Sequence, residues 1–199
     1  MDALRVPGLA ARATVLEPNL EGLGGPVAPV WTATPLVQRR PGLAAESQRQ
    51  FGTDKPAVRV YLPDGPGADI LFDRLKFDWG VIGIDVQRAA GVASSDLKLV
   101  DAVAPSASPA WFLRQFRCGV APICDAQADE LLDGARNTLI PAQRSALLSQ
   151  AAARIDEAQL FIPLTAPVRW SLVSTRVQGF AGNRYARHTL TDLEQRSSP

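Results

Sequence analysis

Apolar and polar residues alternate over residues 57–62, which predicts a β-strand with Val58, Val60 and Leu62 on one face. The five residues that follow, 63–67, read Pro-Asp-Gly-Pro-Gly and are typical of a turn. Beyond this turn the apolar residues recur with a different period, so the strand is expected to lead directly into another kind of element.

Helical spacing begins at residue 68 and continues to residue 83. The residues predicted to form the buried stripe of this helix are Ile70, Leu71, Leu75 and Trp79. Gly80 or Gly83 is expected to end it, and the apolar runs at 84–90 and 96–104 are predicted to be strands. A strand, a helix and a second strand within about 30 residues form a βαβ unit, whose crossover is expected to be right-handed.

Three more helices are predicted, at residues 107–116, 125–137 and 141–159. Ser108 is expected to cap the first of them, with Pro109 in its first turn, and Pro141 has the same early position in the third. The residues predicted to face the core from the second and third helices are Leu131, Leu132, Ala135, Leu147, Leu148, Ala151, Ile155 and Ala158.

The first 56 residues are rich in Pro, Gly and Ala and show no sustained period. They are predicted to form a loop-rich wrap and not a core element, with one short helix at 43–50 that Gly52 and Pro56 end. Taken together, these elements predict an α/β fold, with a small mixed β-sheet flanked by helices.

Composition narrows the classes of function. With 199 residues, 46% hydrophobic content and a net charge of +1, the chain is of ordinary globular composition and has no basic field for nucleic acid. No apolar run approaches the roughly 20 residues that a membrane helix needs. The N-terminus is interrupted by Pro7 and Gly8 and does not have the pattern of a signal peptide. By itself, this pattern favours a cytoplasmic protein, whereas in a fragment it carries no information about the compartment.

Cys118 and Cys124 are the only cysteines, and the loop between them contains Gly119 and Pro122. A turn of this kind can bring two α-carbons within about 7 Å, the separation that a disulfide allows. The alternative is a pair of reduced, partly buried thiols, and the choice depends on an oxidising compartment. Metal binding is disfavoured because the chain has no other cysteine and its single histidine, His188, is distant in sequence.

Residues suited to catalysis are few. A Ser/His hydrolase would need His188, but the chain has no Gly-x-Ser-x-Gly turn to present a serine. Asp125, Asp129 and Asp133 are spaced four residues apart near a helix start, which fits a solvated helix face better than acid/base chemistry. The turn at 63–67 lacks the spacing and the lysine of a phosphate-binding loop. The sequence therefore indicates no enzyme, no cofactor and no metal site.

Aromatic side chains offer a different indication. Trp31, Trp111, Trp170 and Phe180 lie in or beside predicted loops, outside the strongest apolar stripes. Tryptophans in such positions often line ligand clefts, although each of these residues taken alone is more often part of the core.

Six short motifs follow one another in an order that resembles the C-terminal lobe of the family 5 extracellular solute-binding proteins, the periplasmic peptide- and nickel-binding components of ABC importers. The motifs are Ile82-Gly83-Ile84, Ser108-Pro109, Leu131-Leu132, Arg144 with Leu147 and Leu148, Ile162-Pro163-Leu164, and Val177-Gln178-Gly179-Phe180. They cover about residues 55–185. No single motif is specific, but six in this order are.

The resemblance implies a periplasmic-binding-protein-like lobe and a division of the chain into three parts. Residues 1–54 would be the N-terminal wrap, 55–165 the α/β lobe, and 166–199 a crossing segment and tail. Members of the family fold as two lobes around a cleft, so an N-terminal lobe would be missing here. The implied partners are a peptide or small-molecule ligand, the missing lobe and an inner-membrane ABC permease. The implied location of the full-length protein is the periplasm, where a Cys118–Cys124 disulfide would fit.

The resemblance also indicates residues that would line the ligand cleft. They are Asp101, Ala104, Ser106, Ser108 and Trp111 in the strand-to-helix turn, with Arg169, Trp170 and Asn183 in the crossing segment. Asp101, the serines and Asn183 would supply polar contacts, and the tryptophans would stack on the ligand. Many peptide-binding members carry a Trp and an acid just before this helix. Here Asp101 is the only acid of the turn and lies early in it, which opens the way to a less polar solute.

Two other functions stay open at this stage. The chain could be the ligand-sensing domain of a regulator, although its near-neutral charge and the lack of a helix-turn-helix pattern disfavour DNA contact. A small hydrolase that uses a serine and His188 is the second alternative.

Overall fold

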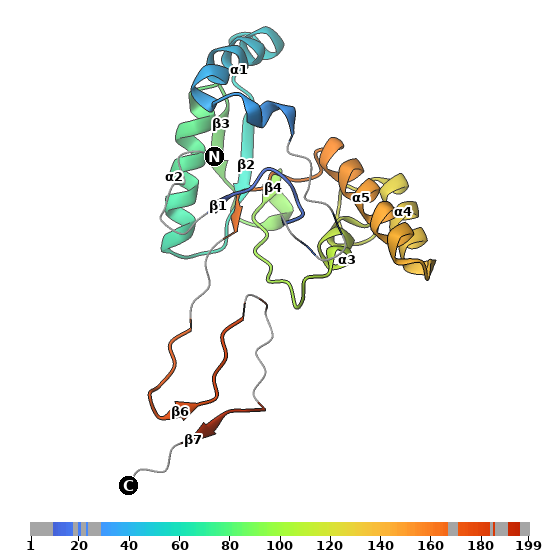
Figure 1. Ribbon diagram of the computed structural model, residues 1–199. Coiled ribbons are helices and arrows are strands. Elements are labelled where there is room, and N and C mark those ends of the chain that lie inside the picture. Colours follow the sequence, from blue (N-terminus) through green and yellow to red (C-terminus); the bar gives the residue numbers. More distant parts are fainter. Residues whose placement is uncertain are drawn as a thin grey trace. The chain divides into compact units, whose positions relative to one another are not determined.

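The computed structural model describes residues 10–17, 20, 23, 29–166, 171–183, 185 and 191–195 (Figure 1). The chain divides into two compact units. One consists of Val30–Ala102 and is called the sheet unit below. The other combines the described residues that precede Val30 with those from Val103 onward, and is called the helical unit. Each unit is described separately.

Three parallel strands form the centre of the sheet unit: β2 (Ala57–Tyr61), β3 (Asp85–Arg88) and β4 (Leu97–Lys98), in the order β3-β2-β4. The helix α2 (Pro66–Gly80) connects β2 to β3, which confirms the predicted βαβ unit. Val60 on β2 pairs with Arg88 on one side and Leu97 on the other, so β2 is the central strand. A short 3-10 helix, η2 (Val92–Ser94), joins β3 to β4. The predicted α/β class is confirmed.

The core of the sheet unit lies between the sheet and α2. Its buried residues are Val60, Leu62, Ala68 and Val86, and the partly buried residues packed against them include Leu71, Phe72, Leu75, Trp79, Leu97 and Leu99. Ile70 is 67% exposed, so its predicted place in the buried stripe of α2 is wrong. The stripe runs through Ala68, Leu71 and Leu75, and a helical step of about 100° per residue turns Ile70 away from it.

The helix α1 (Leu36–Phe51) precedes the sheet and is twice as long as the predicted helix at 43–50. It follows a 3-10 turn, η1 (Val30–Ala33), continues through Pro41 and ends at Gly52, whose φ of 61° suits glycine. An early start is possible because the N–H groups of Gln38 and Arg39 both bond to the carbonyl of Pro35. None of the residues of α1 is buried.

Helices dominate the other unit. The short helix α3 (Pro109–Leu113) continues into η3 (Arg114–Phe116), and α4 (Ala126–Asn137) and α5 (Pro141–Glu157) pack side by side (Figure 1). The buried core consists of Leu16, Leu20, Leu113, Ala128, Leu132, Ala135, Leu148, Ala151, Ala152 and Ile155. Ala158 is exposed just beyond the end of α5, so its predicted inward place is wrong.

The helix starts follow the prolines, as predicted. Pro109 and Pro141 lie in the first turns of α3 and α5. The side chain of Ser108, however, makes no cap hydrogen bond, and only its carbonyl accepts the N–H of Trp111, at 3.0 Å. The side-chain cap that the sequence predicted at α3 is found at α4 instead, where Asp125 accepts the N–H of Ala128 at 2.8 Å.

The N-terminal segment also contributes to the helical unit. β1 (Ala10–Ala11) pairs antiparallel with β5 (Thr165–Ala166), and the N–H of Arg12 donates to the carbonyl of Leu164. Leu16 and Leu20 are buried in the helical core, so the expectation that this segment holds no core element is wrong. Two further strands, β6 (Val177–Gln178) and β7 (Glu194–Gln195), form an antiparallel pair.

Candidate ligand-binding site

The three parallel strands of the sheet unit end at one common edge. Hydrogen bonds extend the pairing just past the strands: the N–H of Ala89 donates to Val60, and that of Leu99 to Tyr61. The chain reaches Asp101 two residues after Leu99. Ligands of open α/β sheets bind outside the carboxyl ends of the strands. Asp101 therefore follows β4 at the edge of the sheet where a ligand is expected.

The charged residues at this edge of the sheet differ in whether they form ion pairs. Arg88, at the end of β3, forms an ion pair with Asp69 in the first turn of α2, and its guanidinium lies 5.7 Å from the ring centre of Phe72. Asp101 is exposed, and within the described part of the chain its carboxylate has no hydrogen bond or ion pair. The Arg88–Asp69 ion pair was not predicted from the sequence, although the position of Arg88 at the end of a predicted strand could have indicated it.

Four of the predicted ligand-binding residues belong to the helical unit. Ala104 is buried, with 9% exposure, whereas Ser106 and Ser108 are exposed on the stretch that leads into α3. Trp111 is half-buried on α3, makes an edge-to-face contact with Phe112 and carries the guanidinium of Arg114 at 5.9 Å. The serine hydroxyls and one face of an indole are thus presented near the start of one short helix.

The remaining predicted residues lie in the C-terminal part of the chain. Asn183 is exposed, and its Oδ1 accepts the backbone N–H of Tyr185 at 2.8 Å. Arg169 and Trp170 lie outside the described residues, as does His188, on which the hydrolase alternative depends.

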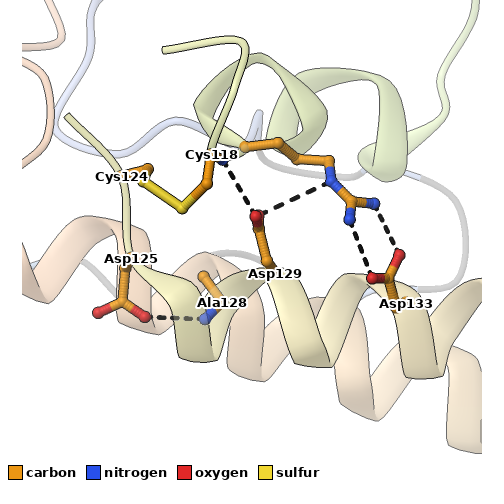
Figure 2. A network of polar contacts seen from close by, with 7 residues as sticks. Cys118, Cys124, Asp125, Ala128, Asp129 and Asp133 are labelled. Carbon is orange, nitrogen blue, oxygen red and sulfur yellow. Dashed lines mark hydrogen bonds and ion pairs between the residues drawn. A yellow bond between two sulfur atoms is a disulfide. The ribbon is translucent and has the colours of Figure 1, made fainter. Parts of the chain in front are cut away.

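Cys118 and Cys124 form a disulfide with their α-carbons 5.1 Å apart, so the disulfide reading of these residues is confirmed. Figure 2 shows this disulfide next to the start of α4. The N–H of Cys118 donates to Asp129 at 3.0 Å, and Asp125, which follows Cys124, caps the helix. The closed loop is therefore attached to the first turn of α4 at both of its ends.

Asp125, which caps α4, and the two aspartates within α4 are all engaged in this network. Arg117 binds Asp133 through two hydrogen bonds of 2.7 and 2.9 Å and lies 3.8 Å from Asp129. The helix N–H of Ala128, more than any other contact, lowers the pKa of Asp125, and hydrogen bonds from Arg117 lower the pKa of Asp133. Carboxylates held ionised in this way stabilise a helix start and are poorly suited to proton transfer.

Comparisons with known proteins identify the fold. No family model matches the sequence, and no curated protein does. Among solved structures, OppA of Burkholderia pseudomallei is similar over 96% of this chain and 41% of its own, with 16% identity and a TM-score of 0.75. A dipeptide-binding protein of Pseudoalteromonas sp. SM9913, solved with Met-Leu, is similar over 95% and 41%, with 16% identity and a TM-score of 0.71. NikA of Staphylococcus aureus, solved with Ni(L-His)2, is similar over 89% and 40%, with 10% identity and a TM-score of 0.66.

These matches define a class of fold, that of the periplasmic binding proteins. In fold, the chain is similar to solved family 5 solute-binding proteins, the group that its motifs resembled, and it spans about two-fifths of their length. This coverage is consistent with part of one lobe of such a protein. The fold that the sequence resemblance implied is confirmed.

Two further properties of the described residues bear on the site. None of the helices found there is long and apolar enough to cross a membrane. In the same part of the chain, no group of three or more His, Cys, Asp or Glu side chains could hold a metal ion.

Proposed function

We propose that this chain forms one lobe of the substrate-binding component of an ABC transporter that imports peptides or a related small solute, and that it acts without catalysis. The observation that carries the proposal is the match of nearly the whole chain to two-fifths of several solute-binding proteins. Two of these were solved with Met-Leu and with Ni(L-His)2, ligands built from amino acids.

The pairing of β1 with β5 supports the role of a lobe. Ala10 and Ala166, which are far apart in sequence, pair on adjacent antiparallel strands of the helical unit. Two adjacent connections are what a lobe needs when it is joined to a second lobe and closes on a ligand by hinge motion. The crossing segment at 166–199 would continue toward that second lobe.

The ligand contacts that we propose follow from the chemistry of the residues. Asp101 offers an exposed carboxylate at the carboxyl edge of the sheet, with no partner among the described residues, and is suited to a cationic group of the solute. Ser106 and Ser108 offer hydroxyls, and Trp111 an aromatic face. Arg169, Trp170 and Asn183 complete the proposed set, with Ala104 as a packing residue behind the turn.

A periplasmic location and an inner-membrane permease partner belong to the same proposal. The Cys118–Cys124 disulfide supports the location, because disulfides persist in oxidising compartments such as the periplasm.

Calorimetric titration of short peptides into the protein joined to its second lobe tests this function. Binding should weaken about tenfold or more in D101N, because an ammonium would lose its charged acceptor. D64N is the matched control, since Asp64 is another exposed acid near this edge without a partner in the described part of the chain. Equal binding by D101N and wild type would remove Asp101 from the site. Upstream DNA that encodes no first lobe would remove the transporter function itself.

A further inference from the structure

The surface formed by η1 and the first turns of α1 is unusually apolar for a solvent-facing helix. Val30 is 91% exposed, Val37 73%, Trp31 44% and Leu43 42%. A shallow, open depression on this surface is lined by Trp31, Gln38, Arg39, Gly42 and Leu43. All of these residues belong to the sheet unit and are separate in sequence from the turn that contains Asp101.

Arg39 is held in place at the centre of this surface. Its Nε donates to the carbonyl of Thr34 at 2.9 Å, and its guanidinium lies 5.0 Å from the centre of the Trp31 ring. Within the described residues its two terminal nitrogens have no hydrogen bond or ion pair. Two such N–H groups side by side match the two oxygens of a carboxylate. The stacking and the Thr34 bond reduce the side-chain entropy that binding would cost.

The other arginines of α1 form ion pairs, unlike Arg39, which has none in the part of the chain that the structure describes. Arg40 pairs with Asp78, and Arg49 pairs with Glu46. Neither η1 nor the first turn of α1 contains an acidic residue. Among the described residues no acidic side chain neutralises the positive charge of Arg39, which borders an indole and a leucine that face solvent.

We propose that Trp31, Arg39 and Leu43 form a binding site for a small carboxylate that carries an apolar group, of the kind found at the C-terminal residue of a short peptide. The guanidinium binds the carboxylate, the indole and Leu43 cover the apolar group, and the amide of Gln38 contacts a neighbouring polar atom. A single guanidinium matches a single negative charge, and the apolar floor disfavours a fully hydrated anion such as phosphate. The shallow shape predicts weak, millimolar binding, which corresponds to about 4 kcal/mol.

Nuclear magnetic resonance titration of the chain with N-acetyl-leucine tests the proposal directly. The indole N–H signal of Trp31, assigned by its loss in W31F, should shift in a saturable way. N-acetyl-leucine amide, which lacks the carboxylate, and acetate, which lacks the apolar group, should each bind at least tenfold more weakly. Inorganic phosphate should also bind more weakly than N-acetyl-leucine. An amide or a phosphate that binds as tightly as N-acetyl-leucine overturns the proposal.

Variants separate the site from the fold. R39Q should weaken binding at least tenfold, and R39K should lose most of the affinity because a lysine cannot reproduce the planar fork. R49Q, on the same helix but paired with Glu46 in the wild type, should bind like wild type. Unchanged thermal unfolding shows that a variant is folded, and a folded R39Q that binds like wild type overturns the proposal. D101N should bind N-acetyl-leucine like wild type, because Asp101 does not belong to this site. A failure of the proposed importer function can therefore be distinguished from a failure of this proposal.

Discussion

Arg154 on α5 contacts the carboxylate that caps α4: its Nη2 lies 2.6 Å from Oδ2 of Asp125, while Oδ1 of the same group accepts the N–H of Ala128. One aspartate thus begins one helix and ties it to its neighbour. The two helices supply most of the buried core of the helical unit, so this residue is placed where a local change affects the whole unit.

Removal of this carboxylate should lower stability measurably. We expect D125A to lower the midpoint of thermal unfolding by several degrees, because it loses the helix cap and leaves Arg154 with only its more distant partner, Glu157. D125N should have a smaller effect, since asparagine caps helices about as well but carries no charge. E130A, at an exposed position of the same helix, is the control for circular dichroism melts. A D125A melt equal to that of E130A would contradict the prediction.

Acid should weaken the sheet unit through Asp96. Hydrogen bonds from the side chain and then the backbone N–H of Arg59 lower the pKa of Asp96 from 3.8 to about 2. Because the folded pKa lies below the unfolded one, the stabilisation is complete above about pH 4 and is lost as the pH falls toward 2.

Urea unfolding at pH 6 and at pH 2 measures this dependence. D96N should be less stable than wild type at pH 6, and the difference should shrink at pH 2. D64N serves as the control, because the exposed Asp64 has no partner within the described residues. A difference that stays constant between the two pH values would assign the effect to packing and not to ionisation.

Asp156 should behave in the opposite way. Burial raises its pKa, and the N–H of Val15, at 3.4 Å, only partly compensates. A raised folded pKa means that Asp156 supports folding below about pH 4 and weakens it as the pH rises through the folded pKa. D156N should therefore be more stable than wild type at pH 7 and equal to it near pH 3 in urea unfolding. A less stable D156N at pH 7 would show that the Val15 contact needs the charge.

Reduction of the Cys118–Cys124 disulfide should cost about 2 kcal/mol of unfolding free energy, the loop-closure value for a short loop. Urea unfolding with and without dithiothreitol measures the change. The double variant C118S/C124S should match the reduced wild type and should not respond to the reductant. A wild type whose stability is insensitive to full reduction would show that Arg117, Asp129 and Asp133 hold the loop by themselves.

The elements whose residues repeat with a clear period were predictable from the sequence. The bounds of the strand β2 and of the helices α2, α4 and α5 were predicted within a few residues. Their buried positions recur at a fixed spacing, which is visible in the sequence as a repeat of apolar residues. The motif order from Ile82 to Phe180 was sufficient to indicate a fold that the structural comparisons confirm. The proline starts at Pro109 and Pro141 were also correct, since the missing N–H of proline costs no helix hydrogen bond in the first turn.

The sequence predictions were wrong where local residue patterns favour more than one structure. Pro41 and the surrounding loop-forming residues concealed the first turns of α1, whose start depends on backbone bonds to Pro35. Leu16, Leu20 and Leu23 are spaced four and three residues apart, but Pro18 and Gly22 interrupt this short repeat in the sequence, so their place in the core of the helical unit was not predicted. Ile70 was assigned to the wrong side of α2 because the apolar residues around it in the sequence fit more than one stripe of helical spacing.

By itself, the sequence determined the α/β class, the starts of α3 and α5 at their prolines and the family resemblance, because these depend on residue types at short spacing. Only the tertiary structure decided which charges are satisfied. Within the described residues Asp101 has no partner, whereas Asp69, Asp96 and Asp125 each pair with an arginine 19 to 37 residues away in sequence. The same holds for Arg39, which differs from Arg40 by one position but points to an indole instead of a carboxylate. Long-range packing chooses the partner of each charge, and the charges that it leaves without a partner are those available to a ligand.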